Sequence, residues 1–186
     1  QTSFDGGVRV PTLFWWPGKV PANTNCDELA STIDVLPTIA KLIDADLPAH
    51  AIDGKDISSL MFGEDNARSP HAYFPHYHHG ELQAIRNDRW KLVFPHKYGS
   101  LNGRLGGTGG LPVKYDSNMA VLALYDRLND PSESKNVIDQ YPEVYDELSK
   151  VADMYRKELG DKLKKIKGSG VRPAGEISPG DEKLSW

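Results

Sequence analysis

Three histidines stand close together in this sequence and offer its clearest chemistry. His76, His78 and His79 are followed by Glu81. On a β-strand, His76 and His78 share one face and His79 points to the other. Two imidazoles and a carboxylate on one face could hold a transition metal if a further ligand came from elsewhere. The same spacing also suits a solvated strand edge or one wall of a substrate pocket, and the residues alone leave all three interpretations open.

A glycine-rich stretch, RLGGTGG, runs from Arg104 to Gly110. It is not a Walker loop, because no Lys-Ser or Lys-Thr pair follows the glycines. It also does not open a helix after a strand, as a dinucleotide-binding fingerprint does. A loop as long as residues 95–117 is usually functional or disordered. We interpret it either as a flexible lid in which Arg104 contacts a ligand, or as a plain solvent loop.

The other candidate residues favour structural roles. Asp126 and Asp130 lie in turn contexts, where carboxylates commonly bind the backbone. Cys26 is the only cysteine, which excludes an internal disulfide framework and a multi-cysteine metal site. The basic run over residues 162–167 indicates a solvated helix end or a local anionic contact. The sequence contains no complete catalytic set, so we assign no catalytic residue and no metal ligand.

A predicted β-hairpin over residues 82–94 lies directly after the histidines. Two apolar-alternating runs flank Asn87 and Asp88, and both residue types favour tight turns. Residues 121–125 are rich in β-formers and predict another strand. These strands are expected to form one small antiparallel sheet.

One strongly amphipathic helix is predicted after the strands. Pro142 opens it, where a missing N–H costs little, and Gly160 ends it. Residues 71–79 predict a further strand, which Pro75 confines to a sheet edge or a bulge. The predicted fold class is therefore α+β, with a small antiparallel sheet packed against a long C-terminal helix.

The N-terminal part of the chain predicts elements of another layer. Residues 8–16, from Val8 to Trp16, hold their apolar side chains in a run, which is typical of a strand buried on both faces of a parallel sheet. No second strand of that kind is present, so its partners are expected elsewhere. An unpaired apolar strand predicts self-association through residues 8–16. Residues 31–43 predict a helix with one apolar face, made of Leu36, Ile39, Ala40 and Ile43.

Composition narrows the class of protein. Of the 186 residues, 39% are hydrophobic and 26% charged, which is ordinary for a globular protein. The net charge of −4 argues against an electrostatic nucleic-acid binder. No apolar run reaches the length of a membrane span. The first residue is Gln1, so we expect a chain cut from something longer.

The opening segment reads FDGGVRVP from Phe4 to Pro11, and FWWPG follows from Phe14 to Gly18. This segment resembles sulfatases of the alkaline-phosphatase-like superfamily. Arg9 could clamp a carboxylate such as Asp5, where the family more often has Glu. Further family-like pieces follow in the right order up to Asn136. They are STID with Pro37-Thr38, Asp53-Gly54 with Ser59-Leu60, AIRNDRWK from Ala84, and Leu124-Tyr125-Asp126 with Asn129-Asp130-Pro131.

The resemblance implies a sulfuric-ester hydrolase of the arylsulfatase type. That family uses calcium and a formylglycine made from a Cys/Ser-x-Pro-x-Arg motif. Cys26 is followed by DELA and does not match, and no serine here begins such a motif. The family's calcium ligands and catalytic histidines precede the region that aligns here. The chain is therefore expected to be the C-terminal portion, inactive alone, with the missing N-terminal catalytic part as its partner.

The resemblance also implies a sulfate ester as the substrate, and it places His76, His78 and His79 at the substrate-binding site. Arg104 of the glycine-rich loop is the fourth expected binding residue, and the polar connector around residues 64–70 marks the expected domain boundary. The family implies a periplasmic, secreted or lysosomal protein. Residues 1–66 are expected to be the edge of the α/β catalytic domain, 67–160 the α+β subdomain and 161–186 a basic, then Gly/Pro-rich, tail. The alternative is a non-catalytic module that binds a sugar or an anion.

Overall fold

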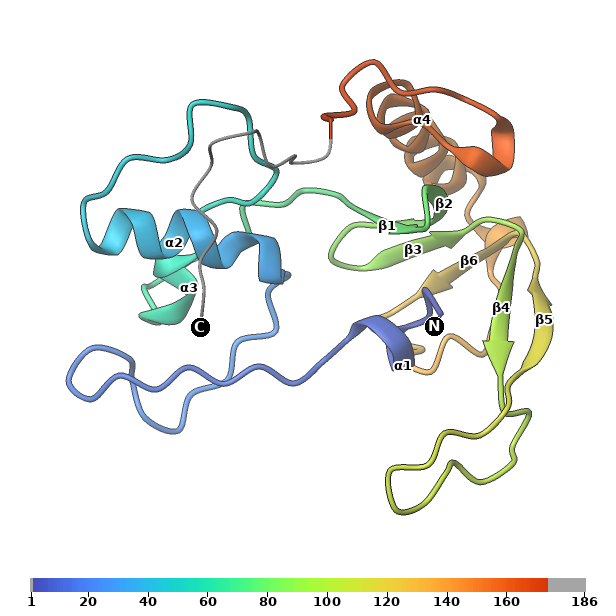
Figure 1. Ribbon diagram of the computed structural model, residues 1–186, viewed down its shortest axis with the longest axis horizontal. Coiled ribbons are helices and arrows are strands. Elements are labelled where there is room, and N and C mark those ends of the chain that lie inside the picture. The colour runs from blue at the N-terminus through green and yellow to red at the C-terminus, as the bar shows by residue number, and fades with distance from the viewer. Residues whose placement is uncertain (1, 174–186) are drawn as a thin grey trace, which may run out of the picture.

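Four antiparallel strands form the main sheet, in the order β1-β2-β3-β6. The computed structural model describes residues 2–173 (Figure 1). The predicted hairpin is confirmed, and Asn87 closes it, because its Oδ1 accepts a hydrogen bond of 2.7 Å from the Trp90 N–H. The strands of this sheet are β1 Phe74–His78, β2 Glu81–Arg86, β3 Trp90–Val93 and β6 Ala123–Asp126. The edge position predicted from Pro75 is also confirmed, because β1 is an outer strand.

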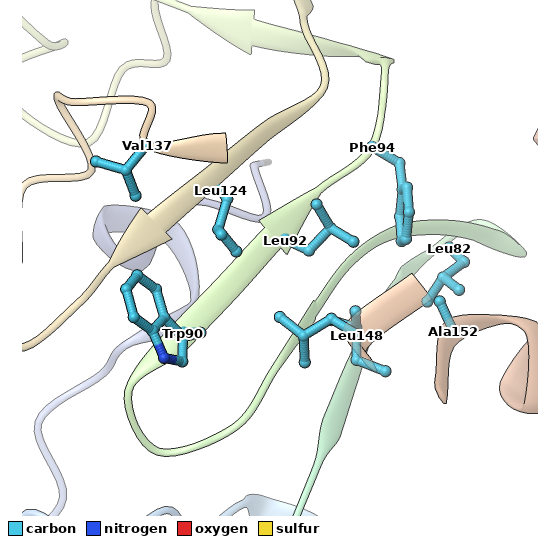
Figure 2. Packing of buried hydrophobic residues seen from close by; sticks show 9 residues of the cluster. Leu82, Trp90, Leu92, Phe94, Leu124, Val137, Leu148 and Ala152 are labelled. Atoms are coloured by element: carbon cyan, nitrogen blue, oxygen red, sulfur yellow. The ribbon is translucent and has the colours of Figure 1, made fainter. Parts of the chain in front are cut away.

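The long helix α4, Pro142–Leu159, packs across one face of this sheet. Gly160 ends it with a φ of 82°, which glycine adopts without strain. Two helix residues, Leu148 and Ala152, are fully buried in the core (Figure 2). They belong to one cluster with Leu82, Ile85, Trp90, Leu92, Phe94, Leu124 and Val137. The predicted α+β class is confirmed.

A second, two-stranded sheet corrects the prediction of one long loop over residues 95–117. Strands β4, His96–Ser100, and β5, Asp116–Ala120, pair antiparallel and project from the main sheet (Figure 1). Most of their residues are exposed or half-buried. Neither strand therefore needs the alternating apolar pattern by which strands are recognised. The glycine-rich stretch is the tip of this hairpin.

The strand predicted for residues 8–16 is not formed. Helix α1, Asp5–Val8, covers its beginning, and residues 10–16 are exposed and without regular structure. A strand needs a neighbour to satisfy its N–H and C=O groups, and no strand of the described residues lies beside it. Its apolar side chains point to solvent, with Trp15 exposed at 81%.

The predicted helix over residues 31–43 exists but buries a different face. It consists of η1 Thr32–Asp34 and α2 Val35–Leu42. Thr38 is buried, and its Oγ1 accepts from the Ile57 N–H at 3.0 Å, just before α3, Ser58–Met61. The predicted apolar face is buried only at Ala40. Its other members face solvent, namely Leu36, Ile39 and Ile43.

The remaining short elements close the chain around α4. They are the 3-10 turns η2, Ile138–Gln140, and η3, Lys162–Lys164. Between α4 and η3, buried Asp161 accepts hydrogen bonds from Arg156 Nε at 3.0 Å and from the Leu82 N–H at 3.3 Å. The first part of the predicted tail is thus tied to the sheet, and residues 174–186 lie outside the described residues. No helix in the part of the chain that the structure describes is long and apolar enough to cross a membrane.

We expect this chain to self-associate through residues 8–16, because large apolar side chains and unpaired backbone groups lie together there. Light scattering should show the mean mass rising with concentration. Replacing Phe14 and Trp15 with lysine should abolish that rise. Leu105→Lys is the matched control, because Leu105 is 90% exposed at the tip of the β4–β5 hairpin. A double variant that associates as readily as the parent would contradict the prediction.

Candidate functional site

The candidate site lies on the face of the sheet opposite α4. Paired residues on neighbouring strands share a face, because side chains alternate along each strand. One row crosses the sheet through successive pairs, namely Phe74, Arg86, Lys91 and Tyr125. His76 lies two residues from Phe74 and joins this face. Helix α1 lies on this side of the sheet and α4 on the other (Figure 1).

Lys91 is fully buried and joins two carboxylates on this face. Its Nζ lies 3.0 Å from Asp5 Oδ1 and 2.7 Å from Glu133 Oε1. Arg127 adds a second cation, with Nη2 2.8 Å from Asp5 Oδ2. The Asp5 N–H donates to Glu133 Oε2 at 2.7 Å. These four side chains, called here the buried ion cluster, fasten α1 to the sheet.

The pKa of Asp5 reflects this setting. Burial alone would raise it, but hydrogen bonds and charge from Arg127 and Lys91 outweigh burial and hold the pKa well below its usual range. The predicted clamp of Arg9 on Asp5 is wrong. Arg9 Nη2 lies 3.6 Å from Asp27 Oδ1, and both side chains are exposed. Helix α1 turns Asp5 toward the sheet, where buried cations replace Arg9.

Reasoning from sequence did not identify Lys91 or Glu133 as members of a site. A signal exists for Lys91, because Trp90 and Leu92 face α4 and the residue between them must face the other side. Glu133 carries no such signal. It lies in a turn after β6 with a φ of 53°, and only the folded chain brings its carboxylate to Asp5.

His76 lies in β1 beside the buried ion cluster, and its Nε2 has no hydrogen-bond partner among residues 2–173. Burial, followed by the charges of Lys91 and Arg86, lowers the pKa of His76 to about 3. The imidazole is therefore neutral at physiological pH. A neutral imidazole donates one hydrogen bond and accepts one.

His78 and His79 lie at the β1–β2 turn rather than on one strand. Strand β1 ends at His78, and His79 has a φ of 49°. Their ring centroids are 4.2 Å apart, so the prediction that the two rings point to opposite faces is wrong. The turn reverses the chain at His79 and swings its ring back. Partial burial and the neighbouring His79 lower the pKa of His78.

Arg104 is used within its own hairpin. It donates to the carbonyl oxygens of Leu101 and Lys114 and forms an ion pair of 2.9 Å with Asp116. No hydrogen bond or ion pair joins it to the three histidines among residues 2–173. The structure thus brings His78 and His79 together, sets His76 deeper in the same strand, and leaves Arg104 in a separate loop.

The resemblance places the family's calcium ligands before this chain, and the carboxylates of Asp5, Glu133 and Asp34 are engaged by other groups. Calcium takes about six to eight oxygen ligands. The carboxylates of Asp5 and Glu133 are bound by cations, and that of Asp34 accepts from the Ser31 and Lys55 N–H groups. Within residues 2–173, no group of three or more His, Cys, Asp or Glu side chains could hold a metal ion.

Two protein-family models match this chain. The C-terminal model of N-sulphoglucosamine sulphohydrolase matches residues 2–101, and the model of the C-terminal region of aryl-sulfatase matches residues 69–176. Each match covers more than half of the chain. Together they span the buried ion cluster, both sheets and α4.

Curated relatives agree with these matches. Arylsulfatase G of Rattus norvegicus is 32% identical over 166 residues, which are 87% of this chain and 30% of that protein. Arylsulfatase A of Bos taurus is 35% identical over 151 residues, which are 77% of this chain and 29% of that protein. The chain thus spans less than a third of the length of these relatives.

Solved structures share the fold. A Bacteroides thetaiotaomicron structure described under the metabolism of multiple glycosaminoglycans matches with a TM-score of 0.55 and 27% identity, over 76% of this chain and 28% of that chain. A structure described as a 2-O GAG sulfatase matches with a TM-score of 0.51 and 22% identity. The match covers 77% of this chain and 28% of that chain. The family models, the relatives and the shared fold show that this chain belongs to the sulfatase family and corresponds to its C-terminal region.

Proposed function

We propose that this chain is the C-terminal subdomain of a sulfuric-ester hydrolase, and that the whole enzyme cleaves sulfate esters. One observation carries the proposal: the family-like segment FDGG is bound to the sheet through the buried ion cluster. Both matched halves of the chain therefore form one unit, as expected if they act together. The nucleophile, made as formylglycine, and the calcium ion would come from the N-terminal catalytic part, which is the proposed partner.

The proposed division into domains rests on which segments expose apolar side chains. Residues 1–66 carry uncovered apolar side chains, among them Trp15 and Leu36, and would form the edge of the catalytic domain. Residues 67–160 hold the sheet and α4, and residues 161–186 would follow as a tail. The proposed compartment is periplasmic, secreted or lysosomal. The Bacteroides relative described under glycosaminoglycan metabolism supports a sulfated sugar as the substrate class.

The first test of this function is hydrolysis. We expect the purified chain to release no product from a chromogenic aryl sulfate, because it holds neither a Cys/Ser-x-Pro-x-Arg motif nor a calcium site in residues 2–173. The longer protein that includes an N-terminal catalytic part should turn the substrate over. Turnover by the pure chain, above a heat-treated control, would contradict the division of labour. A longer protein that binds sulfated sugars without hydrolysing them would favour a non-catalytic binding module.

The histidines at the β1–β2 turn would contact the alcohol part of the substrate and not its sulfate. In the whole enzyme, we expect His78→Ala with His79→Ala to raise KM for a sulfated sugar and to leave kcat within about tenfold. Contacts made equally in the ground and transition states change KM rather than kcat. A small aryl sulfate, which cannot reach this turn, should be nearly unaffected.

The matched control is His50→Ala, because His50 is exposed in a loop far along the chain from the turn. Loss of kcat by orders of magnitude for both substrates would make the histidines catalytic. No change for either substrate would leave them a solvated edge. In the same proposal, Arg104 and half-buried His76 contribute less to substrate binding. Arg104 is held by Asp116, and His76 lies further from the turn in β1.

A further inference from the structure

Positive charges outnumber negative charges on the face of the sheet opposite α4, called here the open face. Lys91 and Arg127 supply two cations to the buried ion cluster, and Asp5 and Glu133 supply two anions. Arg86 pairs with Lys91 across β2 and β3 and therefore lies on the same face. It brings a third positive charge without bringing a third carboxylate.

The guanidinium of Arg86 is half-buried and has almost no partners. Its Nε donates to the Asn87 carbonyl oxygen at 3.0 Å. No ion pair joins it to a carboxylate within residues 2–173, whereas the neighbouring Arg89 and Arg127 are both paired. Burial, followed by the charge of Arg127, lowers the pKa of Arg86 to about 10. An arginine so placed keeps its two terminal nitrogens free for an anion.

His76 stands diagonally across the β1–β2 pair from Arg86. His76 pairs with Ala84 and Phe74 pairs with Arg86, so the two side chains are diagonal neighbours on one face. Diagonal neighbours in an antiparallel pair lie about 7–8 Å apart, within reach of a long side chain. His76, whose Nε2 has no hydrogen-bond partner among residues 2–173, is therefore a diagonal neighbour of Arg86, whose terminal nitrogens make no ion pair there.

We propose that Arg86 and His76 together bind an oxyanion with at least two free oxygens, either a carboxylate or a sulfate. The planar guanidinium donates two parallel hydrogen bonds to such a group, and lysine cannot do so. The neutral imidazole of His76, with its proton on Nε2, donates to a further oxygen of the anion. The group could be an acidic side chain of a partner or the sulfate of a ligand, and these two sources share the same chemistry.

Titration of this chain with sodium sulfate and with sodium acetate tests the site, at constant ionic strength set with sodium chloride. We expect a saturable shift of the Arg86 Nε–Hε resonance and a rise in the thermal midpoint. At a concentration ten times the dissociation constant, the folding equilibrium constant should rise about elevenfold. Tighter binding of sulfate would assign the site to a ligand, and tighter binding of acetate would assign it to an acidic side chain.

Variants make the result specific. Arg86→Gln should show no rise in the thermal midpoint when the anion is added. Arg86→Lys should weaken binding about tenfold, because lysine keeps the charge but cannot donate two parallel hydrogen bonds. Arg68→Gln is the matched control, since Arg68 is exposed and lies outside the sheet. The proposal is overturned if neither anion shifts the Arg86 resonance in the parent chain, a measurement that needs no variant to fold. It is equally overturned if Arg86→Gln keeps the full effect. Neither readout depends on sulfatase activity.

Discussion

Replacing Leu148 with alanine should lower the free energy of unfolding by about 2–5 kcal/mol. Leu148 is fully buried in the core between α4 and the sheet. Truncation removes its contacts with the strands and leaves a cavity that a helix and a sheet close only in part. The loss is a large share of the stability of a small domain, which is about 5–15 kcal/mol. A urea titration followed by circular dichroism measures it as a lower midpoint.

An alanine substitution at an exposed position of α4 is the matched control, because it changes helix propensity without removing a buried side chain. Met154 is 69% exposed on α4, so Met154→Ala should change the midpoint little, because alanine favours helix at least as well. If Leu148→Ala has the same midpoint as the parent, α4 is not docked on the sheet in solution. The m-value of both variants should match that of the parent, since neither changes the surface exposed on unfolding by much.

The parts of the fold that were predictable are those whose signals are local. The turn at Asn87, the proline at the start of α4 and the glycine at its end each act within a few residues, and the structure confirms them. Strands β4 and β5 escaped prediction because neither buries a full face. Residues 8–16 carry the pattern of a buried strand, but a pattern does not supply partner strands, and none lies beside them among the described residues.

The candidate site was harder to predict, because its members are far apart in the chain. Asp5 and Glu133 are joined by Lys91 through contacts that cross most of the described residues, and no short motif contains all three. A buried lysine also contradicts the usual rule that lysine stays at the surface. The three histidines were conspicuous, yet the turn at His79 decides where two of their rings lie.

Removing the charge of Lys91 should be the most damaging single change on the open face of the sheet. We expect Lys91→Met to lower the free energy of unfolding by about 3–5 kcal/mol, because it leaves ionised carboxylates buried without their cation. Arg127 would still neutralise Asp5 in part, but Glu133 would lose its ion-pair partner. Chemical denaturation at neutral pH measures the loss. A change below about 1 kcal/mol would mean that water reaches the cluster.

A second substitution and a pH series show whether Lys91→Met destabilises through the lost charge or through altered packing of the side chain. Lys91→Met combined with Glu133→Gln should recover part of the stability, because the unpaired carboxylate is gone, and a double-mutant cycle gives the coupling between the two side chains. The folded-state pKa of Asp5 is depressed, so its contribution is present above its unfolded pKa, about 3.9, and is lost as the pH falls further. Without Lys91, Asp5 loses part of the charge that keeps its pKa low, so the folded variant takes up a proton at a higher pH than the folded parent. The difference between the parent and Lys91→Met should therefore shrink as the pH is lowered from 7 toward about 3. If the difference is the same at both pH values, Lys91 acts through its hydrocarbon stem and the electrostatic account fails.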